Sequence, residues 1–534
     1  EYNVFAGFIL SLGLLLFSRI AFSLSLIGFF LAYGFYNLIG AEITIYDYSF
    51  FGFNYILSSI ALGGFFLIPS RNTYLWMILL IPFVAILTIS LNMVFMQVKL
   101  PIYALPFNLI VLLFLYILKF REKYSYSLSE VYFQYNAPEK NLYIFLNNKQ
   151  RFRYKLFTPF KLPFFGSWKV SQGQDGEITH QGAYRYAWDF NIEDSDGKQF
   201  KNEGDYPEDY YCYNKPVIAP EDGIVESITD GIDDNTIGKS NLIDNWGNTV
   251  IIKHVNDIYS KLSHLKKGSL TVKKGEDVKY GQIIGHCGNS GRSPYPHLHF
   301  QIQPYPYIGS VTMDYPLSNY IEHKNGQFTF QTYSKPKKDQ WVSNVEVNNL
   351  LVSALDFIPG QILKFEVADG GKLINIEWEV LVNEFNQSYF HCKHSGAKAY
   401  FENDKTLFYF TYFEGDKHSY LFLLYLALFR MQKGCYQGLI VKDQYPLYLT
   451  YPQTILWFHD FISPFVRFVK SKYSMLIKNV DDTLSPSQIV LESTMHNYFM
   501  HRLVNHKEFK IEIDASGIKT IKMNSKKGEV YFKR

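Results

Sequence analysis

Two histidines at alternate positions are the first sign of chemistry in this chain. They lie in the stretch Pro-His-Leu-His-Phe at residues 296–300, which is typical of a short strand. Because residues i and i+2 of a strand project from the same face, His297 and His299 can both enter one cleft. A lone pair of this kind is more often an ordinary strand pair than a metal site, so a metal site needs further ligands.

Three more residues supply those ligands. His180 ends the stretch Gly-Glu-Ile-Thr-His, Asp189 follows nine positions later in Tyr-Ala-Trp-Asp-Phe, and His264 lies in Tyr-Ser-Lys-Leu-Ser-His-Leu. Two histidines and an aspartate suit tetrahedral zinc with one position left for water. The remaining histidines could act on that water or on a developing oxyanion.

The sequence around these residues resembles the lysostaphin-type, or LytM-type, peptidoglycan endopeptidases. The resemblance covers roughly residues 160–305. It is most specific in the glycine-rich run at 275–285, in Gly-Asn-Ser-Gly-Arg-Ser at 288–293 and in the histidine pair at 296–300. It implies a zinc cofactor, and peptidoglycan peptides as the substrate.

The resemblance also implies a role for each candidate residue. His180, Asp189 and His299 become the zinc ligands, and His264 and His297 flank the attacking water as catalytic residues. Which of these two is the base stays open. Most family members place the first two ligands closer together than the eight intervening residues found here, and a subset has a longer interval of this kind.

Other residues of this region are expected to support the fold. The glycines between 281 and 291 fall where turns need positive φ or close packing. Trp246-Gly247-Asn248 is predicted to be a hairpin turn rather than part of a site. His254 is predicted to be a structural residue or a partner of the site's ligands.

The first 120 residues are rich in aromatic residues and almost free of charge. Apolar runs cover Val4–Phe17, Ile20–Leu38, Tyr74–Phe95 and Ile102–Phe120. The last two are each long enough to cross a bilayer as helices, and the first two predict a tight helical hairpin or packed helices. Residues 50–64 are too rich in Gly and Ser for a lipid-facing span, which favours a half-helix buried among other helices.

This part resembles the second repeat of a bacterial urea transporter. The resemblance is carried by Glu1-Tyr2-Asn3 with Gly7, by Gly52-Phe53-Asn54 with Ala61-Leu62-Gly63, and by Leu100-Pro101 with Leu105-Pro106-Phe107. It implies a candidate urea path at Asn54, Leu100 and Phe107 and a homotrimer, and only about one of the family's two repeats is present. Ala104 stands where the family has a threonine that lines the path, so the alternative is an anchor without transport.

The composition and charge of the chain argue against several other kinds of site and partner. Four widely separated cysteines form no CxxC pair, which speaks against a cysteine–zinc site or a disulfide scaffold. A net charge of +3 without a basic stripe gives no reason to expect nucleic acid as a partner. The His-Cys-Lys-His stretch at 391–394 is interpreted as incidental. The chain begins with Glu1 in a strong apolar run, so we expect an N-terminal part to precede it.

The sequence therefore predicts a multidomain chain of 534 residues. Its parts are an α-helical transmembrane part at 1–120, a linker at 121–150, a β-rich lysostaphin-type metallopeptidase domain at 151–310, and a further mainly β domain at 311–534. Within the last domain, Tyr420–Phe429 is predicted to be a buried helix. The aromatic-rich stretch at 454–462 favours ordinary core, with contact to a membrane surface as the alternative.

These features predict a membrane-anchored zinc metalloendopeptidase that acts on peptidoglycan peptides. The alternatives are a urea channel with a regulatory peptidase-like domain and a catalytically inactive binding module. The expected location is the inner membrane, as a multi-pass protein in contact with the lipid bilayer. Its substrate favours an extracytoplasmic enzyme, whereas Lys119, Arg121 and Lys123 after the last apolar run favour the cytoplasmic side. The sequence leaves this conflict open.

Overall fold

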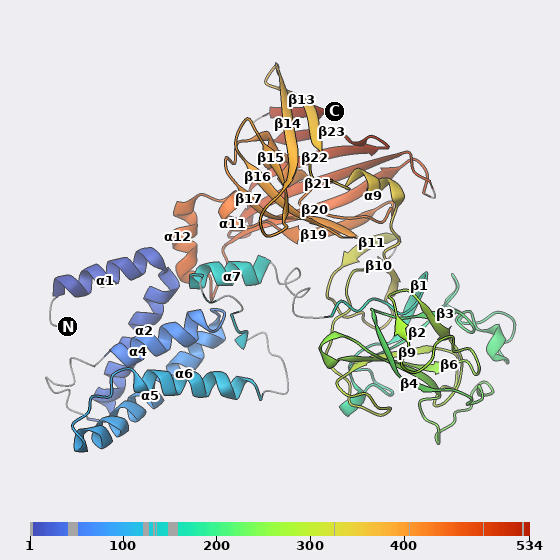
Figure 1. The fold of residues 1–534 in the computed structure, drawn as a ribbon, viewed down its shortest axis with the longest axis horizontal. Coiled ribbons are helices and arrows are strands. Elements are labelled where there is room, and N and C mark those ends of the chain that lie inside the picture. Colours follow the sequence, from blue (N-terminus) through green and yellow to red (C-terminus); the bar gives the residue numbers. More distant parts are fainter. Residues whose placement is uncertain are drawn as a thin grey trace. The chain divides into compact units, whose positions relative to one another are not determined.

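The chain forms two compact units in its computed structural model (Figure 1). One unit comprises residues 1–149, 444–471 and 496–505, and the other comprises 150–443, 472–495 and 506–534. The structure describes residues 4–40, 52–120, 128–131, 134, 136–147, 158–324, 326–404, 406–483, 485–525 and 528–534. Part of the predicted linker at 121–150, including Arg121 and Lys123, and the stretch Glu1-Tyr2-Asn3 lie outside the described residues.

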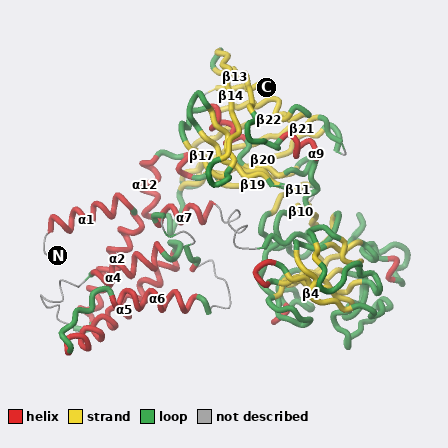
Figure 2. The backbone as a smooth tube through the Cα atoms, viewed as in Figure 1, coloured by secondary structure: helices red, strands yellow, loops and turns green. Residues whose placement is uncertain are grey.

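The first unit is helical, as Figure 2 shows by its red segments. Two of its helices, α2 and α5, are long and apolar enough to cross a membrane. The helices are α1 (Val4–Phe17), α2 (Arg19–Leu38), α4 (Phe53–Ile60) with η1 (Ala61–Phe65), α5 (Arg71–Gln97), α6 (Leu105–Leu118), α7 (Pro138–Asn147), α11 (Leu447–Thr450) and α12 (Gln453–Ile462).

One predicted span is shorter than expected. The run Ile102–Phe120 yields α6, which has only 14 residues. Lys99 and Tyr103 have φ values of 55° and 41°, a left-handed conformation that a right-handed helix cannot contain. Pro106 then lies in the first turn of α6, where a missing N–H costs little. The helix therefore begins at Leu105, and the predicted 20-residue length of this span is wrong.

The predicted half-helix is confirmed as the short helix formed by α4 and η1. Gly52 precedes it with a φ of 104°. Asn54 is fully buried at its start, where its side-chain amide donates to the carbonyl of Tyr103 at 3.0 Å and its side-chain oxygen accepts from the N–H of Phe107 at 3.2 Å. Asn54 therefore joins the half-helix to the start of α6.

Buried charges join three helices of this unit that are far apart in sequence. Glu139 of α7 accepts hydrogen bonds from the Ser18 hydroxyl and the Ile20 N–H, both at 2.8 Å, and so caps the start of α2. The Arg19 guanidinium donates to Asp460 of α12, and its Nε lies 3.8 Å from Glu139. Glu139 and Asp460 are buried, so this cation offsets the cost of burying two carboxylates.

Loss of this cation is expected to destabilise the helical unit. We expect Arg19→Met to lower the free energy of unfolding by about 3 kcal/mol, because it leaves two carboxylates buried without their partner. Arg71 is the matched control, since it is exposed and donates only to the Phe465 carbonyl. Unfolding of the detergent-solubilised chain would measure both variants. Equal, small losses for Arg19→Met and Arg71→Met would contradict this role.

The second unit is β-rich. Seven antiparallel strands form its first sheet region, and a separate pair lies beside them. The strands are β1 (Ser167–Gln172), β2 (Ala187–Asn191), β4 (Gly223–Thr229), β5 (Asn248–Lys253), β6 (Tyr259–Leu265), β7 (Asp277–Val278) and β9 (Leu298–Gln303), with β3 (Pro216–Ile218) paired to β8 (Ile283–His286). Pairing runs β4–β5–β6–β9–β2–β1, so β2 and β9 lie side by side in the middle.

Strands after residue 310 continue this sheet, because β12 pairs with β1. The apolar core around Trp188 and Phe300 also takes in Tyr315 and Val342. The later elements are β10 (Tyr320–Lys324), β11 (Gln327–Gln331), β12 (Trp341–Asn344), α9 (Asn349–Ala354), β13 (Ile362–Asp369), β14 (Lys372–Val382), β15 (Ser388–Cys392), β16 (Lys398–Asn403), β17 (Leu407–Glu414), α10 (Tyr420–Ala427), β18 (Arg430–Gln432), β19 (Leu439–Gln444), β20 (Val469–Val480), β21 (Gln488–Phe499), β22 (Arg502–Asp514), β23 (Gly517–Ser525) and β24 (Gly528–Lys533).

The mainly β character predicted for the C-terminal part is confirmed by these strands. The apolar run Tyr420–Phe429 contains α10, whose residues are almost all buried, which confirms the predicted buried helix. Cys392, from the histidine- and cysteine-containing stretch at 391–394, is buried in β15 as a free cysteine.

Candidate active site

The pairing of two central strands brings the first two ligand candidates together. In β2 and β9, Asp189 lies directly opposite His299, and Phe190 lies opposite Leu298. Because side chains alternate along a strand, the apolar residues enter the core while Asp189 and His299 share the other face. The Nδ1 atom of His299 lies 2.8 Å from Oδ1 of Asp189.

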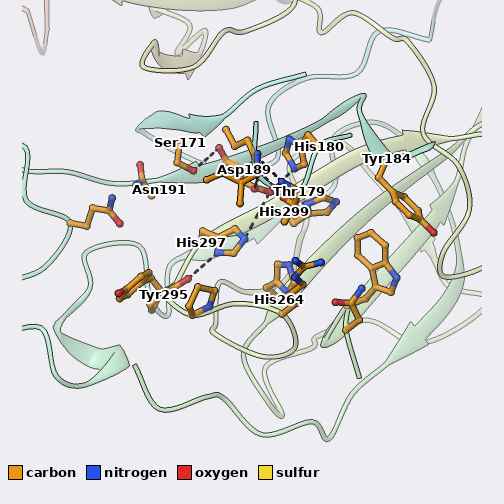
Figure 3. A pocket seen from close by; sticks show the side chains of 18 residues that line it. Ser171, Thr179, His180, Tyr184, Asp189, Asn191, His264, Tyr295, His297 and His299 are labelled. Carbon is orange, nitrogen blue, oxygen red and sulfur yellow. Dashed lines mark hydrogen bonds and ion pairs between the residues drawn. The ribbon is translucent and has the colours of Figure 1, made fainter. Parts of the chain in front are cut away.

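His180 reaches the same point from a loop (Figure 3). Its Nε2 atom lies 3.3 Å from Oδ1 of Asp189, and its Nδ1–H donates to the carbonyl of Gly173 at 2.9 Å. One donor atom from each of His180, Asp189 and His299 lies within 4.8 Å of the others, and all three residues are buried. The structure therefore brings all three predicted metal ligands together despite the long interval between His180 and Asp189.

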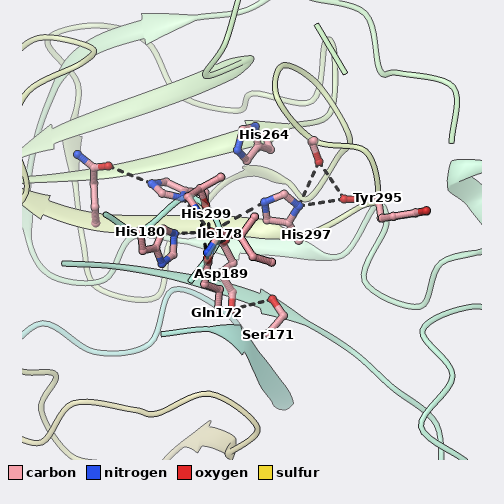
Figure 4. Close-up of polar contacts among 12 residues, drawn as sticks. Ser171, Gln172, Ile178, His180, Asp189, His264, Tyr295, His297 and His299 are labelled. Carbon is pink, nitrogen blue, oxygen red and sulfur yellow. Dashed lines mark hydrogen bonds and ion pairs between the residues drawn. The ribbon is translucent and has the colours of Figure 1, made fainter. Parts of the chain in front are cut away.

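Gln172, at the end of β1, organises both parts of this cluster (Figure 4). Its side-chain amide donates to Oδ2 of Asp189 at 2.8 Å, and its carbonyl oxygen accepts from the N–H groups of Ile178 and Thr179 at 3.0 and 3.1 Å. It thus fixes the carboxylate and the loop that carries His180. The sequence analysis missed this residue, because no local motif marks a glutamine in a strand.

The hydrogen bonds leave a set of atoms that fits a metal ion. The Nε2 atom of His299 lies 3.0 Å from the side-chain oxygen of Gln301, whose own amide donates to Gln303, so Nε2 carries the proton. Nδ1 of His299 and Oδ1 of Asp189 are then two acceptors only 2.8 Å apart, which calls for a cation between them. Donors on tetrahedral zinc lie about 3.3 Å apart, close to the separations found here.

Electrostatics agrees with this assignment. Burial opposes charge on Asp189, but the neighbouring His180 and His297 hold the pKa of its carboxyl well below the ordinary value. Burial lowers the pKa of His299. For His180, burial acts against the charged form, yet Asp189 raises its pKa overall. A carboxylate that stays charged beside imidazoles is the donor set that zinc requires.

The two candidate catalytic histidines present the same nitrogen to the cleft. Nδ1–H of His264 donates to the Ser290 carbonyl at 2.8 Å, and Nδ1–H of His297 donates to the Tyr295 carbonyl at 2.9 Å. Each Nε2 is therefore an acceptor when the ring is neutral. The ring centroids of His264 and His297 lie 4.8 Å apart. Burial lowers the pKa of His264 well below its ordinary value, with help from His297 and His299.

Backbone geometry holds His264 in place. Its φ is 62°, a left-handed conformation that is uncommon outside glycine and is often retained at functional sites. The neighbouring segment approaches closely, since a Cβ at Gly288 would lie 2.3 Å from the backbone nitrogen of Lys266. This approach lets the Ser290 carbonyl reach His264, and Gly288 shows the close packing predicted for this glycine run.

Trp246 lines the cleft, so its exclusion from the site was wrong. Its ring lies 5.4 Å from that of His299 and 5.5 Å from that of Tyr184. On its other side, the buried Lys261 ammonium lies 2.9 Å from the ring centroid. The Trp-Gly-Asn stretch does sit in a turn, with Gly247 at a φ of 61°. Sequence alone identified the turn but could not show that its tryptophan faces the histidines.

The cleft has a volume of 390 Å³ and is lined by all five predicted residues. Arg292, Tyr295 and Ile178 also line it. His254 does not: its Nδ1–H donates to the Asp222 carbonyl and its Nε2 lies 2.8 Å from the Ser260 hydroxyl. Both bonds fit the structural role predicted for His254.

The candidate urea path lies in the other unit. Asn54 and Phe107 are joined by the hydrogen bond described above, and Leu100 is exposed in the turn before α6. Both polar atoms of the Asn54 side chain are bonded to backbone groups. Their role in transport stays a prediction.

In this β-rich domain, a buried carboxylate and two imidazoles converge beside two further histidines. This is the donor set of a zinc hydrolase. Family models agree. Residues 2–119 match the model described as urea transporter, and residues 209–310 match peptidase family M23. The chain therefore carries a urea transporter region followed by a zinc metallopeptidase region of family M23. His180 and Asp189 precede the matched stretch, and the structure adds them to it.

Individual relatives share shorter stretches. Peptidoglycan DD-endopeptidase ShyA of Vibrio cholerae is 46% identical over 56 residues, which are 10% of this chain and 13% of that protein. Endolysin 2638A of Staphylococcus phage 2638A is 35% identical over 91 residues, 16% of this chain and 18% of the phage protein. The matched stretch thus spans less than a fifth of either relative.

Two solved structures each match 28% of the chain. The catalytic domain of lysostaphin from Staphylococcus simulans is 24% identical, with 28% of this chain and 88% of that domain covered and a TM-score of 0.18. A zinc-containing peptidase from Vibrio cholerae is 23% identical, with 28% and 37% covered and a TM-score of 0.19.

Gln172 provides a test of how the ligands are held. We expect Gln172→Leu to weaken zinc binding by about 10- to 100-fold, because Asp189 and the His180 loop both lose a hydrogen-bond partner. Gln174→Leu is the matched control, since Gln174 donates to the Tyr315 carbonyl instead. Zinc titration against a competing chelator measures both. Unchanged affinity in Gln172→Leu would show that Gln172 does not hold the ligands.

Proposed function

We propose that this chain is a membrane-anchored zinc metalloendopeptidase that hydrolyses peptide bonds of peptidoglycan. The observation that carries the proposal is the convergence of His180, Asp189 and His299 beside the paired rings of His264 and His297 in one cleft. Two imidazoles and one carboxylate leave a tetrahedral metal with an open position, which distinguishes catalytic from purely structural zinc sites.

His180, Asp189 and His299 would hold zinc through Nε2, Oδ1 and Nδ1. Zinc would supply a Lewis acid that polarises the scissile carbonyl and makes water more acidic. The histidines His264 and His297 would handle the protons. A neutral ring accepts the proton of the attacking water at Nε2 and returns it to the leaving amine, and the other ring, when protonated at Nε2, donates a hydrogen bond to the oxyanion. Which histidine plays which part stays open, and no covalent bond to the protein forms.

Peptidoglycan as substrate is supported by the names of the relatives. ShyA is described as a peptidoglycan DD-endopeptidase, as is ShyC of Vibrio cholerae, which is 40% identical over 86 residues. The cleft itself offers an aromatic wall at Trp246 and Tyr184, a cation at Arg292 and an open side. Such a wall suits an extended peptide.

Substitution of two neighbouring histidines separates metal binding from catalysis. We expect His299→Ala to lose both zinc and hydrolysis, because it removes a ligand. His297→Ala should keep its zinc and lose activity by about 100- to 10,000-fold, the range for one acid–base residue. Zinc content by elemental analysis and release of peptides from purified peptidoglycan measure the two effects.

The control for both is His286→Ala, a histidine of β8 that does not line the cleft. It should keep zinc and activity. Full activity in both His297→Ala and His299→Ala would overturn the proposed function. Loss of zinc from His297→Ala would instead move that residue into the ligand set.

We further propose that the helical unit anchors the enzyme in the inner membrane as a multi-pass protein. The urea transporter match and the lengths of α2 and α5 support this. Access to peptidoglycan requires the cleft to face the extracytoplasmic side. Reporter fusions after Phe120 and after Ser310 would locate the domain, and we expect activity of a periplasmic reporter at both positions. A cytoplasmic location would exclude intact cell wall as the substrate.

Urea transport is the second candidate function, supported by the family match over residues 2–119. Ala104 argues against it, because a methyl group replaces the hydroxyl that would meet urea. We expect liposomes carrying the chain to show no more urea flux than empty vesicles, and Ala104→Thr is the matched variant to compare. Flux well above empty vesicles would establish a channel that carries a peptidase. The homotrimer implied by the resemblance stays a prediction.

A further inference from the structure

In its second half, the helix α12 buries polar residues and exposes apolar ones. Leu456, His459, Asp460 and Ser463 are buried, and three of these four are polar. The opposite side carries exposed apolar residues, at Phe458 with 65% exposure, at Ile462 and at Val466. The helical turn continues past Ile462, since Val466 donates to the Ile462 carbonyl at 2.8 Å. A helix in water shows the reverse arrangement.

The buried polar residues of α12 form hydrogen bonds with other helices of this unit. Asp460 accepts from Arg19 and from the Tyr143 hydroxyl, and His459 Nδ1 lies 2.8 Å from that same hydroxyl. An incorrect rotation of α12 about its axis therefore does not account for its exposed apolar side. It is exposed because the polar contacts of Asp460 and His459 fix the rotation of α12.

A hairpin beside α12 extends the apolar surface. The turn between β21 and β22 carries Met500, which is 66% exposed, and Leu503 and Val504 follow it. The Met500 N–H donates to the Phe468 carbonyl at 2.7 Å, which ties the hairpin to the chain just after α12. Both turn residues, Met500 and His501, have positive φ, where Asn and Gly are preferred. We call the exposed set the apolar strip: Phe458, Ile462, Val466, Met500, Leu503 and Val504.

The apolar strip lies at the level where the two longest helices begin. Arg19 and Arg71 are the first residues of α2 and α5, and both bond to the α12 region, at Asp460 and at the Phe465 carbonyl. The ring of Tyr74 lies 4.6 Å from that of Phe465. A membrane helix changes from water to lipid at its ends, and aromatic and basic residues gather there.

Asp460, within α12, is buried and paired with Arg19, and the exposed charges of the neighbouring segments are basic. Residues 461–471 and 496–507 contain no Asp or Glu, and Arg467 and Arg502 are exposed. Exposed basic residues beside an apolar surface match the headgroup region of a bilayer, where anionic lipid attracts cations and the acyl boundary accepts apolar side chains.

We propose that the apolar strip is seated in the headgroup–acyl boundary of a phospholipid bilayer. The C-terminal part of the chain is then held at the membrane surface by α12 and the 499–504 hairpin as well as by its covalent link to the spanning helices. This proposal rests on the membrane anchoring proposed above. It goes beyond that anchoring, because it gives a lipid contact to residues that follow the peptidase region by more than a hundred positions in sequence.

Lipid-quenching of single labels tests the proposal on the full chain. An environment-sensitive fluorophore is attached at Phe458→Cys and at Met500→Cys, with the chain in vesicles of phosphatidylcholine and phosphatidylglycerol that contain nitroxide lipid. The natural cysteines are buried except the half-buried Cys435, so the parent chain gives the background. We expect quenching at both positions about threefold above that at a water-exposed control.

Two matched labels make the outcomes distinct. Phe385→Cys is the control, an equally exposed apolar residue of a turn flanked by Asn383, Glu384 and Asn386. Phe83→Cys, exposed in the middle of α5, reports on membrane insertion itself. Quenching at Phe83 but only control-level quenching at Phe458 and Met500 would overturn this proposal and leave the anchor intact. No quenching at Phe83 would overturn both.

A protein partner would give a different result. If a second copy of the chain covers the strip, the labels at Phe458 and Met500 are shielded from nitroxide lipid and equally from aqueous iodide. That result overturns the lipid contact. Accessibility to lipid with protection from iodide is the result that supports it.

Discussion

Asp189 must keep a negative charge in the interior of the β-rich unit, and much of the active site follows from that requirement. A buried carboxylate without partners costs several kcal/mol. Here Gln172 donates to one oxygen, and the ring nitrogens of His180 and His299 lie against the other, where a bound cation would neutralise the charge. Each partner is itself fixed by a further hydrogen bond, to Gly173 for His180 and to Gln301 for His299. The result is an anionic centre with donor atoms already oriented for a cation.

The same strands that bury Asp189 also define the working side of the cleft. β9 contributes His299 opposite Asp189, and His297, just before this strand, lies at the rim, where the exposed fraction is higher. β6 contributes His264, whose Nδ1 is held by the loop at Ser290. The metal ligands and His264 therefore lie deep, and His297 lies towards solvent. This order suits hydrolysis, in which the substrate carbonyl must approach from the open side.

Local sequence patterns predicted the parts of this site that depend on local structure. The two-residue spacing of His297 and His299 predicted a strand, and the strand begins at Leu298, so it contains His299 and follows His297 directly. The stretch at 246–248 was correctly predicted as a turn. Its tryptophan lines the cleft because this turn leads into β5, which pairs with β6, and that placement depends on tertiary structure. No local sequence pattern marks Gln172, because its role depends on the pairing of β1 with β2, which places it opposite Asp189. The length of α6 was overestimated because hydropathy carries no information on backbone conformation, and residues with positive φ precede this helix.

In the helical unit, too, buried charges require partners, and here the partners are far apart in the sequence. Arg19 and Asp460 are 441 positions apart, yet neither could be buried without the other. No pattern in either stretch reveals the pairing, because each looks like the polar edge of an apolar run. Once the pair forms, α12 can rotate no further, and its apolar side must face outward. The apolar surface of α12 is thus a consequence of where its charge is neutralised. An amphipathic pattern alone would not distinguish this helix from ordinary core, whereas the position of its one buried carboxylate does.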